Sequence, residues 1–161
     1  MPAQQRVYDA DQVKAAFLYH FGSYVQWPVA RADPITIAVL GDAAVASNLA
    51  QFLPGRSIED RLVEVRALER IEDLADEELL FVGSAHNARL AQVLAAVDRR
   101  PVLVVTDAPD GLDHGAMVNF QLVDSRVRFE ISVPRAEEAG LVLSSRLLAA
   151  ALRVETATPD R

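Results

Sequence analysis

Hydrophobic and polar positions along the chain follow the periods of helices and strands. The first regular segment, residues 9–27, carries apolar and aromatic side chains at spacings of three and four. Its stripe consists of Val13, Phe17, His20, Tyr24 and Trp27, widened by Ala16 and Phe21. This spacing predicts an amphipathic helix that Asp9 or Asp11 caps and that ends at Trp27, before Pro28.

The middle of the chain predicts strands and helices in near alternation. Strands are expected at residues 35–40, 61–68, 79–82 and 102–106, and helices at residues 44–52 and 87–97. Such alternation is typical of an α/β fold whose mostly parallel sheet is covered by helices on both faces.

The C-terminal part breaks this alternation. Residues 117–123 and 126–133 alternate in period two about Asp124-Ser125, which predicts an antiparallel β-hairpin added to the sheet. Helices are expected at residues 134–139 and 144–154, the second capped by Ser144 or Ser145. We expect a single domain over residues 1–161, with a core at 9–154 and flexible tails at 1–8 and 155–161.

The composition supports one globular domain and excludes several kinds of chemistry. The 161 residues are 51% hydrophobic and 24% charged, and none is cysteine, which excludes disulfides, cysteine-bound metals and a thiol nucleophile. The net charge is −7 and Lys14 is the only lysine, so we expect no nucleic-acid partner. The polar start fits either a cytoplasmic protein or an exported one whose signal peptide has been removed.

The predicted strand ends carry small and acidic residues, where α/β proteins bind ligands. Gly41-Asp42 lacks the G-x-G-x-x-G pattern of a dinucleotide site. A phosphoacceptor receiver domain needs an aspartate after the third strand and a lysine at a later strand end. Here the third strand ends in Gly83-Ser84, and Lys14 lies on the first helix, so this interpretation fails.

The histidines and serines specify no reaction centre. His20, His86 and His114 lack the spacing of metal ligands, and no G-x-S-x-G pattern surrounds Ser84, which with His86 and Asp107 would form a triad. We therefore expect a protein that is not an enzyme, with no catalytic residue, metal or cofactor.

The amphipathic aromatics of the first helix are the best candidate for a binding site. His20, Tyr24 and Trp27 each join an apolar body to a polar tip. Core packing with each tip hydrogen-bonded is one interpretation. The other is a pocket in which they meet Arg128 and Glu130, which with Arg126 share one side of the hairpin strand. An arginine beside an indole suits a planar or anionic small ligand.

Several of these segments together resemble the YfiR family of periplasmic proteins. The likeness covers about residues 13–154. It rests on residues 13–21 running into Trp27-Pro28, on 37–42, Arg89-Leu90, 104–107 and 127–131, and on 141–148 with Ser144-Ser145.

The resemblance implies an α/β homodimer in the periplasm that regulates and does not catalyse. It implies binding to the periplasmic domain of a membrane-bound diguanylate cyclase, whose repression lowers cyclic-di-GMP signalling and biofilm formation. An outer-membrane lipoprotein is implied as a second partner. It also implies an aromatic or nucleotide-like ligand near Trp27 and Arg128. Thiol-based control, known in the family, is excluded here because cysteine is absent. The alternative is a periplasmic small-molecule-binding module without a cyclase partner.

Overall fold

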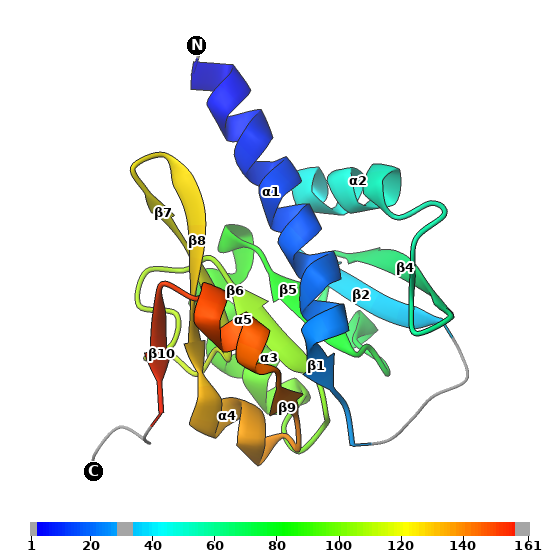
Figure 1. Ribbon diagram of the computed structural model, residues 1–161, viewed down its shortest axis with the longest axis vertical. Coiled ribbons are helices and arrows are strands. Elements are labelled where there is room, and N and C mark those ends of the chain that lie inside the picture. The colour runs from blue at the N-terminus through cyan, green and yellow to red at the C-terminus, as the bar shows by residue number, and fades with distance from the viewer. Residues whose placement is uncertain (1–2, 29–33, 157–161) are drawn as a thin grey trace.

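The computed structural model describes residues 3–28 and 34–156, and Figure 1 shows their arrangement. Parts of the two predicted tails, residues 1–2 and 157–161, lie outside the described residues. The first half contains α1 (Ala3–Tyr24), β1 (Val25–Gln26), β2 (Ile35–Leu40), α2 (Ala43–Phe52), β3 (Ser57–Ile58), β4 (Arg61–Leu68), η1 (Ile71–Asp73) and β5 (Leu79–Val82). The second half contains η2 (Ser84–Arg89), α3 (Leu90–Ala96), β6 (Leu103–Thr106), β7 (Val118–Val123), β8 (Arg126–Ser132), α4 (Val133–Glu138), β9 (Val142–Leu143), α5 (Ser145–Ala150) and β10 (Arg153–Glu155).

The predicted α/β fold is confirmed. One sheet has the strand order β10-β8-β7-β6-β5-β2-β4-β3, and β4, β2, β5, β6 and β7 run parallel within it. The predicted hairpin joins β7 to β8, with Phe120 opposite Phe129. The short β1 and β9 form a separate antiparallel pair, Val25 opposite Leu143. The parallel strands therefore place all their carboxyl ends on the same edge of the sheet.

Helices cover both faces of the sheet, as the alternating pattern predicts. Residues of β2 point in turn to the two faces: Ile37 and Val39 enter the core beneath α1 and α2, while Ala38 and Leu40 enter a second core beneath α3. Because strands such as β2 and β5 are buried on both faces, their sequences read as continuous apolar runs.

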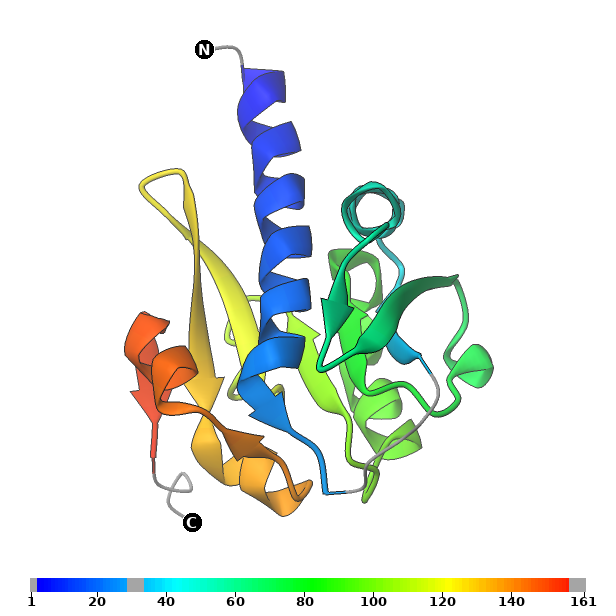
Figure 2. The same cartoon turned by 45° about the vertical axis from the view of Figure 1, so that its right-hand side comes forward.

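Helix α1 differs from its prediction at both ends and in its buried face. It begins at Ala3 and ends at Tyr24, because Val25 and the next residue pair with β9. Its buried hydrophobic positions are Ala15, Leu18 and Phe21. Members of the predicted stripe lie at the margin of this buried face: Phe17, Tyr24 and Trp27 are partly buried, and Val13 and His20 are exposed. Figure 2 shows the N-terminal turns of α1 extending beyond the sheet.

The predicted helix at 144–154 is shorter than expected. Ser144 caps α5 as predicted, with its Oγ accepting from Leu147 N at 3.2 Å. The helix ends at Ala150, and the chain then adds β10 to the sheet edge, with Leu152 N donating to Phe129 O at 2.7 Å. The ladder to β8 replaces the helical hydrogen bonds there. Glu155, which we expected to begin the flexible C-terminal tail, is therefore the last residue of β10.

A buried carboxylate attaches β10 to the sheet. Glu130 of β8 is 3% exposed, and its Oε2 accepts from Arg153 Nε at 3.2 Å and from Nη2 at 3.0 Å. Its Oε1 accepts from Asn119 Nδ2 at 3.4 Å, and Asn119 Oδ1 accepts from Thr106 Oγ1 at 2.6 Å. This hydrogen-bonded chain connects β6, β7, β8 and β10 on the face away from α1.

We expect Arg153→Met to destabilise the protein by about 1–3 kcal/mol, because it leaves the buried Glu130 without its cation. Urea denaturation measures the loss, and amide hydrogen exchange at residues 153–155 should rise first, since β10 loses its anchor. Arg126→Met, on the exposed end of β8, is the control. Equal stability of Arg153→Met and the control would contradict the anchoring role of Glu130.

Candidate functional site

Helix α1 passes over the carboxyl ends of the parallel strands and brings the only lysine to them. Lys14 Nζ lies 2.9 Å from Asp107 Oδ2, just after β6, and both side chains are largely buried, at 14% and 13% exposure. The other oxygen, Asp107 Oδ1, is buried without a hydrogen-bond partner in the described part of the chain. The ion pair therefore holds α1 to β6 and leaves one buried carboxylate oxygen without a hydrogen bond.

Two more carboxylates surround this ion pair. Asp42 follows β2 and caps α2, with Oδ1 accepting from Val45 N at 3.0 Å. Asp11 stands on α1 one turn before Lys14. Burial raises the pKa of Asp11, and the charges of Asp42 and Asp107 raise it further, while Lys14 lowers it. The strand ends thus form an acidic edge at which Lys14 pairs with one of the carboxylates.

Beside this edge, α1 and the hairpin enclose what we call the strand-end groove, a cavity of about 500 Å³. Its lining is Lys14, Asp107, Ala108, Pro109, Asp110, Phe120, Gln121 and Leu122. Phe17 and Phe120 meet with ring centroids 6.1 Å apart, and Val13 and Leu122 come next along α1 and β7 toward the hairpin tip. Val13 and Leu122 are 39% and 64% exposed, so this groove has an apolar rim. Figure 2 shows α1 and the hairpin projecting side by side.

A second cavity lies further along α1. The aromatic groove, of about 200 Å³, lies between α1, β8 and α5 and is lined by Phe17, His20, Phe21, Tyr24, Phe129, Leu147 and Ala150. His20 and Tyr24 stack at its margin, with centroids 6.5 Å apart. Among the described residues, its lining contains neither arginine nor lysine, which suits an uncharged apolar or aromatic ligand better than a phosphate.

The structure does not bring the five predicted ligand residues into one pocket. His20 and Tyr24 share the aromatic groove, but the Trp27 Nε1–H donates to Glu78 O at 2.9 Å, before β5. The strand registers put Glu78 and Arg128 about six residues apart along the strand direction, roughly 20 Å. Trp27 therefore packs with its indole N–H hydrogen-bonded, as the core-packing interpretation of the sequence predicts.

Arg128 and Glu130 also lie on the wrong face for such a pocket. Their neighbours Val127 and Phe129 pack into the core beneath α1, so period-two alternation directs the two charged residues to the opposite face. Glu130 is occupied by Arg153. The predicted contact between the first helix and the hairpin arginines is therefore wrong, because α1 packs on the apolar side of β8.

The sequence pattern does not predict several of the polar contacts in the structure. Lys14 reaches Asp107 only because α1 crosses the strand ends, a tertiary relation that periodicity does not encode. Glu77 and Glu78 are buried at 1% and 3% exposure and are bound by arginines of β4. In the sequence, the signal for these two buried carboxylates is their place directly before the apolar run of residues 79–82. Among the described residues, no three His, Asp or Glu side chains gather as a metal site.

The raised pKa of Asp11 predicts a pH-dependent effect of Asp11→Asn. The folded state holds the proton more tightly than the unfolded chain, so ionising Asp11 costs stability as pH rises through its folded pKa. We expect Asp11→Asn to melt above the wild type at pH 7, and the difference to shrink below about pH 4, near the ordinary pKa of aspartate. Asp113→Asn, on an exposed loop, is the control. A melting difference independent of pH would contradict this account.

Comparison with known proteins gives a family and a fold. The family model described as YfiR/HmsC-like, DUF4154, matches residues 11–151. A search among curated proteins finds no match. A crystal structure titled as a conserved domain protein from Vibrio cholerae O1 biovar El Tor strain N16961 has a similar fold, with a TM-score of 0.60 and 12% identity. The similarity covers 90% of this chain but 60% of the Vibrio chain.

No helix among the described residues is both long and apolar enough to cross a membrane. The YfiR/HmsC-like family consists of regulatory, non-catalytic proteins of the periplasm that act in diguanylate cyclase signalling. The match to its model includes nearly every element from α1 to α5. The chain belongs to the YfiR/HmsC-like family.

Proposed function

We propose that this protein is a repressor that binds the periplasmic sensor domain of a membrane-bound diguanylate cyclase and holds the cyclase inactive. The observation that carries the proposal is the family match over residues 11–151. Repression requires preferential binding to the inactive conformation, since equal affinity for both states shifts no equilibrium. An outer-membrane lipoprotein that competes for the same surface would relieve repression.

The strand-end groove is the surface that we assign to the cyclase. It is concave, its rim exposes Val13 and Leu122, and its floor holds the Lys14–Asp107 ion pair. Apolar rim contacts supply buried area, while the partly exposed side chains of Lys14 and Asp107 offer charged groups at the floor. The groove also stands between the two elements that project furthest from the sheet, α1 and the hairpin (Figure 2).

Leu122→Arg tests this surface. We expect it to weaken binding to the purified periplasmic domain of the cyclase at least tenfold, because it puts a charge where an apolar contact is buried. The matched control is Leu62→Arg on β4, near the other edge of the sheet: Leu62 is 67% exposed and Leu122 is 64% exposed. Biolayer interferometry compares the two variants.

The cellular result separates repression from binding alone. Deleting the gene should raise cyclic-di-GMP, and the Leu62→Arg protein should restore the lower level while Leu122→Arg does not. An unchanged cyclic-di-GMP level after deletion would contradict the repressor proposal.

Light scattering of the purified wild type and the two variants measures whether the protein forms the homodimer that the family resemblance implies. If Leu122→Arg alone turns a dimer into a monomer, the groove joins two copies and is not the cyclase surface.

A second candidate function, small-ligand binding, is favoured by the aromatic groove. Its apolar lining and the stacked His20 and Tyr24 suit a neutral aromatic molecule. Trp27, Arg128 and Glu130 are left out of this proposal, because the first is hydrogen-bonded elsewhere and the other two lie on the far face.

We expect calorimetry to detect binding of indole and not of a guanosine nucleotide, since the groove lacks a cation for phosphate. Ala150→Trp should abolish the heat by filling the groove. Ala149→Trp places the same side chain one residue earlier on α5, outside the lining, and should leave binding intact. Equal loss in both variants, or no heat with indole, would dismiss this site.

A further inference from the structure

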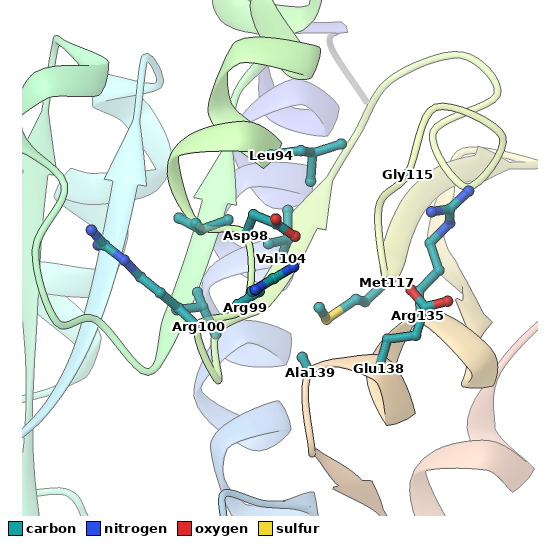
Figure 3. A pocket seen from close by; sticks show the side chains of 12 residues that line it. Leu94, Asp98, Arg99, Arg100, Val104, Gly115, Met117, Arg135, Glu138 and Ala139 are labelled. Atoms are coloured by element: carbon teal, nitrogen blue, oxygen red, sulfur yellow. The ribbon is translucent and has the colours of Figure 1, made fainter.

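A third cavity lies on the face away from α1, between α3 and α4, and is independent of the proposed function. This α3–α4 groove, of about 150 Å³, is lined by Leu94, Val97, Asp98, Arg99, Arg100, Val102, Val104, Gly115, Met117, Arg135, Glu138 and Ala139. Figure 3 shows Asp98 and Arg99 on one side and Arg135 and Glu138 on the other, with the Met117 side chain between them.

The charges of this groove differ from those of the whole protein. Three arginines and two carboxylates line it, whereas the chain carries a net charge of −7. Arg100 points away in Figure 3, and its Nη1 donates to Ala75 O at 2.7 Å. Within the described residues, the side chains of Arg99 and Arg135 make no hydrogen bond or ion pair. Two guanidinium groups are thus free to bind an anion.

The backbone holds Arg99 at the groove in a conformation that arginine rarely adopts. Its φ is +65°, in the left-handed region that favours glycine, and it lies in the turn of residues 97–99 that follows α3. A glycine at this position would relieve the strain. Arginine at position 99 is therefore less favourable for the backbone than glycine would be, although its side chain lies at the rim of the groove.

The side chains on the floor of the groove determine what kind of group fits beside a bound anion. Leu94, Val104 and Met117 present aliphatic and thioether surface between the charged walls. Gly115 keeps the space open, since a Cβ there would lie 2.6 Å from Leu94 Cδ1. A volume of about 150 Å³ corresponds to roughly five water molecules, so the ligand is small.

From these observations we propose that the α3–α4 groove binds a small organic monocarboxylate with an apolar body. Its carboxylate accepts hydrogen bonds from the guanidinium groups of Arg99 and Arg135, and its apolar body lies on Met117 and the neighbouring side chains. Asp98 and Glu138 repel a second negative charge, which favours a monoanion over a dicarboxylate or a phosphate dianion.

The chain offers a specific probe of this groove, because it contains two methionines and one of them is Met117. In protein labelled with methyl-¹³C methionine, benzoate should shift the Met117 methyl signal in a saturable manner, and Met117→Leu assigns that signal. Benzamide, which has the same shape without the charge, should cause little shift. Inorganic phosphate should not compete with benzoate.

Variants of the rim test the role of each charge. Arg99→Gly and Arg135→Gln should each weaken benzoate binding about tenfold or more, as expected for a lost hydrogen bond to a charged group. Arg99→Gly should melt at or above the wild type, because glycine accepts the positive φ, which separates ligand binding from folding. The double variant Asp98→Asn with Glu138→Gln should bind benzoate more tightly.

Arg89→Gln, an exposed arginine outside the groove lining, is the control and should titrate as the wild type does. The proposal is overturned if benzoate leaves the Met117 signal unshifted at tens of millimolar. It is also overturned if benzamide binds equally well or if Arg135→Gln titrates like the wild type. None of these results bears on cyclase binding, so the proposal stands or falls separately from the repressor function.

Discussion

The position of α1 depends on one cluster of four phenylalanine rings. Phe17 and Phe21 of the helix pack against Phe120 and Phe129 of the hairpin, with ring centroids between 5.1 and 6.1 Å apart. Aromatic pairs at these separations add directional stability to their large buried area. Because these rings hold α1 across the hairpin, they place Lys14 over the strand ends. They also separate the aromatic groove, which Phe17 lines, from the strand-end groove, which Phe120 lines.

Buried carboxylates give the sheet its second constraint. Arg61 of β4 binds Glu78 at 2.6 Å, across the beginning of β2, and Glu78 also accepts from Thr36 N. At the opposite edge Glu130 binds Arg153 of β10. Removing one partner of such a pair is costly because a charge stays buried, so each pair favours one strand arrangement over its alternatives. The chain places arginines, not its single lysine, in these pairs, and their forked donors suit carboxylates.

Hydrophobic periodicity predicts the elements whose burial is decided locally. Strands 61–68 and 79–82 match β4 and β5: every residue of β5 is buried, and β4 buries Val63 and Leu68 while Leu62 faces solvent. It fails where tertiary pairing decides: β10 replaces a predicted helix turn at Arg153 because Glu130 binds that side chain. The same limit applies to the site. His20 and Tyr24 meet because they share α1, whereas the face that Arg128 occupies depends on which side of the hairpin α1 covers.

The two grooves along α1 are joined by one ring contact, because Phe17 of the aromatic groove packs against Phe120 of the strand-end groove. This contact determines how a ligand can influence a partner. A molecule in the aromatic groove and a protein on the strand-end groove contact the same helix from two sides. If either one favours a different position of α1, each must change the affinity of the other by the same factor. Among the described residues, the lining of the α3–α4 groove includes no residue of α1 and no aromatic ring. Its link to α1 runs through β6, where Val104 faces α3 and Val105 faces the core of α1. Because that strand is buried on both faces and paired on both sides, it resists displacement, and coupling should be strongest along α1.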